Sequence, residues 1–328
     1  MKLNDCKKRK KILSLGAVLL CASIFVSCTN TNNKVIFSEY WTENANIATE
    51  NINEELEYAV TFEKGTGLDM QYNLDYTNGT YITRLKTEQL DGKTVYVYET
   101  DFSITVTYLY KGESVDLQDS VKTSVKFEKA SSALYPISSH KEIVSHSPQN
   151  GAANSLENCY AEYKYNIDTT YDNEGKGVCV ITKPEEEESN SITSEFSIDT
   201  KKYNYLDNEQ LLFALRGLSP ASISPPTFSV YNAFANSVQK IKVSFSSETG
   251  ADFEFLNNGV SVKDTISYYS ADISINSQNP GATQTAWIAK TVDPSKNTYR
   301  NVVLKLKTPM SYNLGTLVYT LKSANFSK

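Results

Sequence analysis

The chain has 328 residues, with 32 Lys and Arg against 38 Asp and Glu, so its formal net charge is −6. An acidic protein is a poor partner for nucleic acid or for anionic lipid headgroups, because both are polyanions. Tyr is in excess, at 22 residues against 2 Trp and 2 His, and Tyr favours strands.

The first 28 residues have the pattern of an export signal. A basic segment, 7–11, precedes an apolar run, 12–26, which is too short to cross a membrane comfortably. The run ends in Ser27-Cys28 and is followed by polar Thr and Asn residues. This end resembles a bacterial lipobox, although Phe25 stands where Leu is usual. The resemblance implies cleavage before Cys28 and acylation of that cysteine.

The export signal predicts three segments: a signal peptide at 1–27, a lipidated cysteine with a polar tether at 28–54, and a folded part at 55–328. Removing 1–27 takes away six Lys or Arg and one Asp, which leaves a net charge near −11. We expect an extracytoplasmic, lipid-anchored protein. It would lie on the outer membrane where the cell has one, and otherwise on the outer face of the plasma membrane. A cleaved secretory signal and an uncleaved anchor are the alternatives.

The rest of the chain has a β pattern almost throughout. Apolar and polar residues alternate in 121–127, 241–245 and 317–321, and 94–110 is long enough for a bent strand. Alternation indicates one buried and one wet face, as in an antiparallel sheet. Dipeptides that supply the positive φ of tight hairpin turns recur between these runs: Asn78-Gly79, Asp91-Gly92, Lys111-Gly112 and Asn258-Gly259.

Cys159 and Cys179 are the two cysteines that remain unacylated in the predicted mature chain. Export makes a disulfide possible, and two buried free thiols are the alternative. The segment 172–177 between them is a turn pattern. A hairpin turning there does not place the two cysteines opposite each other, which disfavours a simple bridge across the hairpin.

One segment, 207–218, has a helical pattern. Asp207 can cap its first turn, and Gln210 can reach back to form a capping box. One apolar stripe runs along it, and Gly217 with Pro220 ends it. A single amphipathic helix in a β chain is expected to plug or cover a curved sheet.

The sequence offers little catalytic chemistry. His140 and His146 do not have the spacing of a metal site, and we expect both on a loop or strand surface. No nucleophile elbow, phosphate-binding loop or Cys-x-x-Cys motif is present. We therefore expect no enzyme activity, no metal and no cofactor.

Four features occur in order along the chain: Leu134-Tyr135-Pro136, the 207–218 helix, Trp287-Ile288-Ala289, and 302–306 before the terminal strand 315–319. Together they resemble an uncharacterised domain-of-unknown-function family of bacterial envelope proteins. That family's fold is similar to the lipoprotein-localisation factors: a strongly curved antiparallel sheet, an unclosed barrel, with a helix over its mouth. The resemblance implies one domain over 55–328, with a boundary near 200–226 as the alternative, and no catalytic residues.

These observations lead to two functional hypotheses. The first is a non-enzymatic envelope lipoprotein that holds an apolar or amphipathic ligand, such as a lipid, in a sheet concavity. Its predicted lining residues are Leu212, Phe213, Phe253, Phe255 and Trp287. The alternative is a structural or adhesive surface protein that binds protein or glycan on Tyr-rich sheet faces.

Overall fold

The structure is a computed structural model that describes residues 53–65, 74–130, 133–149, 155–184, 190–200, 204–218, 220, 225–275, 283–290, 301–311 and 314–326. The predicted signal segment, Cys28 and nearly all of the tether lie outside these residues. The described strands are β1 (Asn53–Lys64), β2 (Leu74–Leu90), β3 (Lys93–Tyr110), β4 (Glu113–Ala130), β5 (Ala133–Pro148), β6 (Tyr160–Tyr171), β7 (Lys176–Thr182), β8 (Ile192–Ser197), β9 (Asn204–Leu206), β10 (Thr227–Asn232), β11 (Ser237–Phe245), β12 (Thr249–Asn257), β13 (Val260–Ile275), β14 (Gln284–Ala289), β15 (Val303–Pro309) and β16 (Gly315–Phe326).

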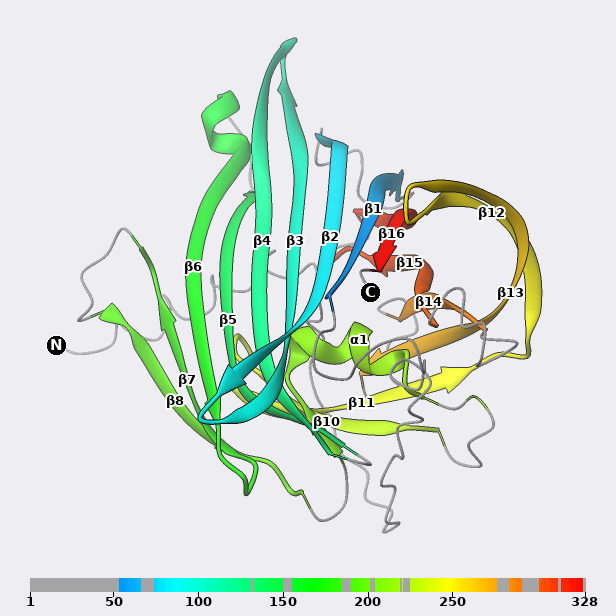
Figure 1. Cartoon of the computed structure of the whole chain (residues 1–328). Helices are drawn as coiled ribbons and strands as arrows, with labels where there is room; N and C mark the ends of the chain where they lie inside the picture. Colours follow the sequence, from blue (N-terminus) through cyan, green and yellow to red (C-terminus); the bar gives the residue numbers. More distant parts are fainter. Residues whose placement is uncertain are drawn as a thin grey trace, which may run out of the picture.

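All of these strands belong to one hydrogen-bonded sheet. Its order is β8-β7-β6-β5-β4-β3-β2-β1-β16-β15-β14-β13-β11-β10-β9, and β12 pairs with β13 and β16. The long strands β2 to β6 form a tall curved wall, and β12 to β16 curl together on the other side of the molecule (Figure 1). The mostly antiparallel pairing follows from the short hairpin connections along the chain.

The expected unclosed barrel describes only part of this sheet. The sheet has free ends at β8 and β9, but β12 to β16 form a closed ring of five strands. The ring closes because β12 is both the antiparallel hairpin partner of β13 and a short parallel partner of β16, through Leu256–Ser323 and Asn257–Ala324. Closure removes the free edge that β12 would otherwise present. The fold is therefore mostly β and barrel-like, with a closed ring attached to an open curved wall.

Three of the four predicted hairpin turns are confirmed. Asp91-Gly92, Lys111-Gly112 and Asn258-Gly259 all have positive φ at both positions and join consecutive strands. The turn predicted at Asn78-Gly79 is wrong, because these residues lie inside β2 at a break in its register with β3. A Cβ at Gly79 would lie 2.6 Å from the backbone oxygen of Val60. The positive φ of Asn78 therefore builds a β-bulge pressed against β1.

The predicted helix and its capping box are confirmed, but the helix is shorter than expected. It consists of the 3₁₀ turn η5 (Asn208–Gln210) and the helix α1 (Leu211–Leu215). A second 3₁₀ turn, η3 (Leu156–Cys159), precedes β6. All five α1 residues are buried, and the ring of Phe213 packs against Tyr98 and Phe127 on the wall. The helix thus lies inside the curve of the sheet, between the wall and the ring (Figure 1).

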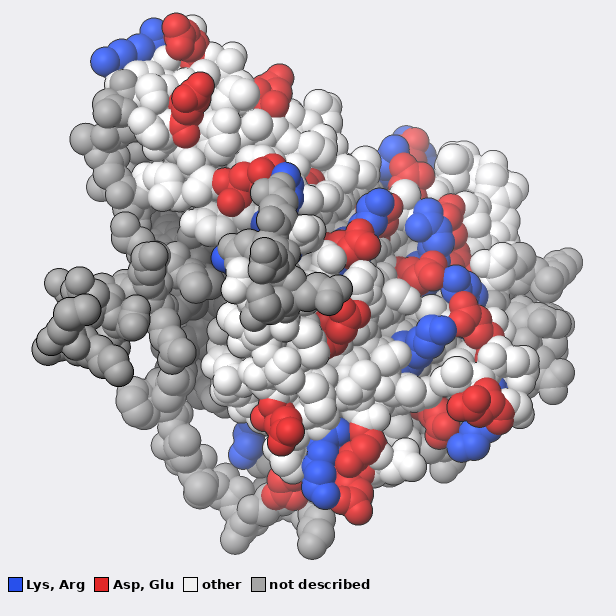
Figure 2. Space-filling model, turned by 90° about the vertical axis from the view of Figure 1, so that its left-hand side faces the viewer, with Lys and Arg blue, Asp and Glu red and all other residues white. Residues whose placement is uncertain are grey.

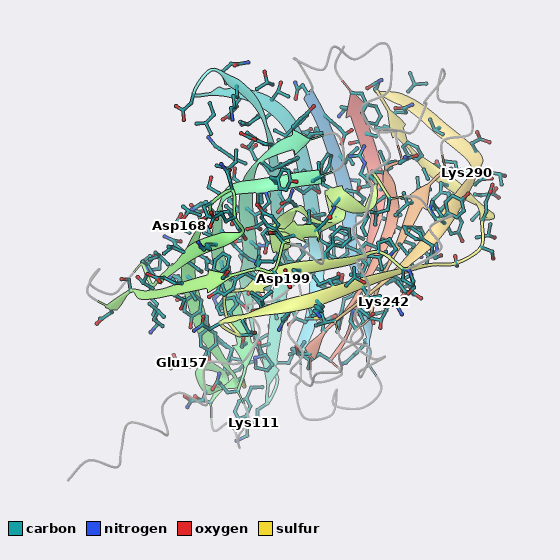
Figure 3. All side chains as sticks on the ribbon, turned by 90° about the horizontal axis from the view of Figure 1, so that it is seen from below. Lys111, Glu157, Asp168, Asp199, Lys242 and Lys290 are labelled. Carbon is teal, nitrogen blue, oxygen red and sulfur yellow. The ribbon has the colours of Figure 1, made fainter. Side chains whose placement is uncertain are left out.

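Tyrosine supplies much of the interior. Ten tyrosines are buried, including Tyr58, Tyr81 and Tyr319, whose rings contact one another. Side chains crowd the space that the strands enclose, while the labelled Lys111 and Glu157 lie at the periphery (Figure 3). The Tyr excess noted in the sequence is therefore mainly core packing on the inward faces of strands.

Charges on the outside are mixed in sign. On the face shown in Figure 2, Lys and Arg lie beside Asp and Glu. Partly exposed cross-strand ion pairs on β1 to β4 include Arg84–Glu55, Lys86–Glu99 and Lys126–Glu88. In the described part of the chain, no helix is long and apolar enough to cross a membrane.

Candidate functional site

The interior contains an ion pair that links the first strand to the end of α1. Arg216 donates from Nη1 and Nη2 to the two carboxylate oxygens of Glu54, at 2.5 and 3.0 Å. Both side chains are only 4% exposed. A bidentate pair of this kind satisfies both charges, and its geometry ties α1 to β1.

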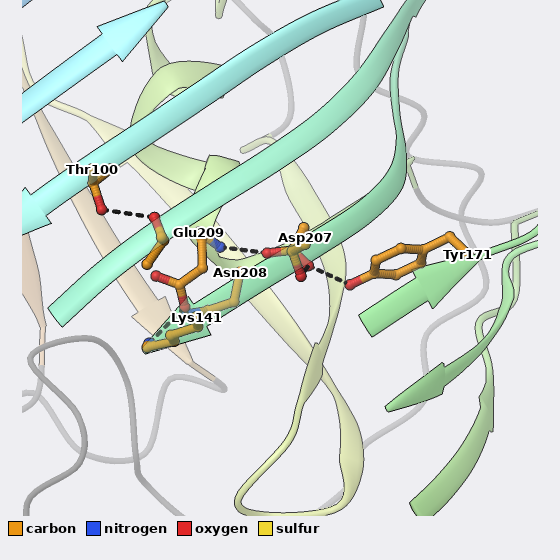
Figure 4. Close-up of polar contacts among 8 residues, drawn as sticks. Thr100, Lys141, Tyr171, Asp207, Asn208 and Glu209 are labelled. Atoms are coloured by element: carbon orange, nitrogen blue, oxygen red, sulfur yellow. Dashed lines mark hydrogen bonds and ion pairs between the residues drawn. The ribbon is translucent and has the colours of Figure 1, made fainter. Parts of the chain in front are cut away.

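A second polar network holds the start of η5 against the wall (Figure 4). The Asp207 carboxylate accepts hydrogen bonds from Ser139 Oγ at 2.6 Å, Tyr171 OH at 2.7 Å and the Glu209 backbone N–H at 2.8 Å. Lys141 Nζ donates to Glu209 Oε1 at 2.8 Å. Burial raises the pKa of the Asp207 carboxyl. These hydrogen bonds join η5 to β5 and β6, so we interpret the network as the anchor of the helix rather than as a ligand site.

A third region has the features of a ligand site. A crevice opens on the concave face of the wall, where β2 to β5 meet the connection between β15 and β16. Together with its open mouth, it encloses about 550 Å³ between atoms, of which about 30 Å³ admits water-sized molecules. We call it the seam crevice. Its lining residues are Tyr76, Phe102, Ile104, Asp119, Val121, Ile143, Val144, Ser145, Thr308, Pro309, Met310, Ser311 and Leu317.

The strand registers explain how these residues meet. Ile104 on β3 stands opposite Asp119 on β4, so the two form one row across these strands. Phe102, Val121 and Ile143 form the next row. Each row faces inward because side chains alternate between the two faces of a strand. The crevice is therefore an apolar trough with one carboxylate in its wall.

Two hydroxyl groups in the crevice have no partner among the described residues. They are Tyr76 OH and Thr308 Oγ1, and each of these residues is 5% exposed. A buried polar group without a hydrogen bond costs roughly 1–3 kcal/mol, so native proteins normally supply a water or a ligand. These groups make the seam crevice the strongest candidate site on the described part of the molecule.

His146 lies behind this carboxylate, and its prediction as a surface residue is wrong. Its side chain is 8% exposed, and its backbone N–H and Nδ1 both lie 2.8 Å from Asp119 Oδ1. The hydrogen bond with Asp119 raises the pKa of His146, and burial raises the pKa of Asp119. His146 is buried because Asp119 compensates its loss of hydration. His140 lies on the strand surface as predicted, 2.7 Å from Asp168.

A larger but shallower groove lies at the free edge of the wall. It is open, encloses about 940 Å³ between atoms, of which about 570 Å³ admits water-sized molecules, and runs over β6, β7 and β8. Its side chains include Tyr171 and Phe196, and Phe196 stacks on Tyr231 at a ring distance of 4.0 Å. Tyr171 is already bonded to Asp207, so this groove presents fewer unsatisfied groups than the seam crevice.

The structure scatters the five residues that were predicted to line a cavity. Leu212 borders a void of about 10 Å³ beside Arg216, and Phe213 is fully buried in the core. Phe253 packs against Tyr268, and Phe255 is buried. Trp287 is half-buried on the other face of β14 from Ala286 and Ile288, with Lys305 over its ring. None of the five lines the seam crevice.

Of the two alternatives left open for Cys159 and Cys179, a disulfide or free thiols, the structure has free thiols, with Cys179 buried and Cys159 partly exposed. Cys179 on β7 stands opposite Thr169, whereas Cys159 immediately precedes β6. Ten residues of β6 separate those positions, about 33 Å at the rise of a strand. That span is several times the reach of a disulfide.

Sequence reasoning missed the seam crevice and the buried ion pairs. Asp119 and His146 are 27 residues apart, and Glu54 and Arg216 are 162 apart. The only local signal was an acidic residue at an inward-facing position of an alternating strand, as at Asp119. The described residues contain no group of three or more His, Cys, Asp or Glu side chains placed to hold a metal ion.

The arrangement defines a barrel-like β protein with an apolar crevice, and comparison with known proteins adds the following. No protein-family model matches the chain, and no curated protein sequence matches it. A solved structure with a similar fold is a β-barrel-like protein of a domain of unknown function, DUF1849, from Brucella abortus. The two share 10% identity and a TM-score of 0.47, over 84% of this chain and 98% of the other.

Proposed function

We propose that this chain is a non-enzymatic lipoprotein of the cell envelope that holds a small amphipathic ligand in the seam crevice. The supporting observation is the combination of apolar walls with the unpartnered hydroxyls of Tyr76 and Thr308. Ligand sites are typically apolar clefts with a few convergent polar groups, and this crevice has that composition.

The export pattern at Cys28 supports the envelope location. A lipid-anchored protein lies where amphipathic molecules are concentrated, so a crevice of this kind is useful there. The space beneath α1 is a poorer candidate, because core side chains and the Glu54–Arg216 pair fill it. The adhesive alternative has less support, because ten tyrosines pack inward instead of facing solvent.

The test is to isolate the full chain from bacterial membranes and analyse it by native mass spectrometry, with chemical identification of released molecules. Thr308→Met fills the crevice, and Thr193→Met places the same side chain on the exposed strand β8 as a control. We expect wild type and T193M to retain a non-covalent small molecule that T308M lacks. A wild-type protein with no retained molecule, or equal retention by T308M, would overturn the proposal.

A further inference from the structure

The seam crevice is apolar except for a small set of oxygen atoms. Its described lining includes the carboxylate of Asp119 but no Lys or Arg. Asp119 lines the same crevice as the two hydroxyls that have no partner in the described structure, Tyr76 OH and Thr308 Oγ1. All of these atoms can accept a hydrogen bond. The polar end of the crevice therefore presents acceptors and one acidic group.

Asp119 keeps one carboxylate oxygen with which a cationic ligand would pair. Both contacts from His146 end on Oδ1, which leaves Oδ2 as the oxygen for a ligand. His146 Nε2 also lies 3.4 Å from Glu162 Oε1, whose side chain is 42% exposed. Lys164 Nζ lies 3.0 Å from Glu162 Oε2 and balances its charge, so the local charge is that of the Asp119–His146 pair: one negative charge with a neutral imidazole and none with an imidazolium. The acidic mature chain adds a long-range negative field.

Resting on the function proposed above, we infer that the ligand is a small amphipathic amine. Its ammonium group would donate three hydrogen bonds, to Asp119 Oδ2, Tyr76 OH and Thr308 Oγ1, one to each available oxygen. Its apolar tail would lie along Phe102, Ile104 and Leu317 toward the mouth. A carboxylate head would meet the negative charge of Asp119, and an alcohol would supply a single donor.

Methionine labelling gives a direct view of this crevice. The chain has three methionines, Met1, Met70 and Met310, and Met310 lines the crevice. We would follow the ¹³C-methyl signal of Met310 in the full chain, held in phosphatidylcholine nanodiscs, while adding octylamine, octanol or octanoate. Met70 serves as the reference signal. The expected result is a saturable shift of Met310 with octylamine at concentrations roughly tenfold below those needed with octanol or octanoate.

Three substitutions separate ligand recognition from a structural role. Asp119→Asn removes the charge and should weaken octylamine binding by about tenfold or more. Asp116→Asn is the matched control, because Asp116 lies on the same strand and accepts a hydrogen bond from Thr107 Oγ1 at the exposed surface. Tyr76→Phe should also weaken binding while leaving the protein equally or more stable, because it removes a hydroxyl that has no partner. A purely structural hydroxyl would give the opposite change in stability.

The outcomes distinguish the inference from the proposed function. Saturable binding of all three probes with equal affinity would retain an amphipathic site and overturn the preference for amines. Octylamine binding that is unchanged in both D119N and Y76F would also overturn the amine inference. No Met310 shift with any probe would overturn the inference and count against the crevice as the ligand site.

Discussion

At the scale of single residues, the molecule places several charges where solvation is lost. Each is compensated locally: Arg216 by Glu54, Lys141 by Glu209, and His146 by Asp119. Such pairs add little net stability compared with apolar residues of the same volume, but removing one partner is costly. Their value here is positional, since each joins segments far apart in the sequence.

The His146–Asp119 pair makes stability depend on pH. Because the folded state raises the pKa of His146, the pair contributes fully below about pH 6.5, the ordinary value, and loses its contribution as pH rises through the folded pKa. His146→Gln should cost about 2–3 kcal/mol at low pH and flatten this dependence, as measured by urea unfolding from pH 5 to 9. His140→Gln is the control, since His140 is half-exposed and its pair with Asp168 is screened. An unchanged pH slope in H146Q would refute this assignment.

At the scale of elements, a neighbouring strand can override local turn chemistry, as the bulge in β2 shows. Gly79→Ala should destabilise the protein by about 2–3 kcal/mol, because the new Cβ would lie 2.6 Å from Val60 O and 2.7 Å from Val60 Cβ. Gly250→Ala on β12 is the matched control, since its nearest contact would be 3.5 Å, and it should change stability by no more than about 0.5 kcal/mol. Thermal unfolding of both variants checks this, and equal effects would contradict the close approach.

Features that depend on local residues could be predicted from the sequence, and features that depend on strand pairing could not. Asp91-Gly92 forms its turn from local φ preferences, and the capping box of Asp207 and Gln210 spans only four residues. Both features could therefore be predicted from the sequence. Asn78-Gly79 has the same local chemistry, but the register of β1 and β3 decides its structure. The burial of His146 and the separation of the cysteines likewise depend on which strands pair, which periodicity alone does not specify.

At the scale of the whole molecule, the seam crevice lies where the open wall meets the closed ring. Strands β2 to β5 supply one side, and β15, β16 and their connection supply the other. The ring closes through only two residue pairs between β12 and β16, and no local sequence pattern predicts this pairing. Junctions between packed units are common places for ligand sites, and this architecture builds one from strands instead of loops.

The anchor determines where this whole assembly acts. Cys28 follows a basic segment, an apolar run and a small residue, and it precedes a polar tether, so we expect it to be acylated. Metabolic labelling with an alkyne fatty acid should mark the wild type and Cys21→Ala, because Cys21 lies within the apolar run and is removed with the signal. Cys28→Ala should lose the label and leave the protein soluble or uncleaved. Label that survives in C28A, or a wild type without label, would remove the envelope anchor and the location on which the proposed function depends.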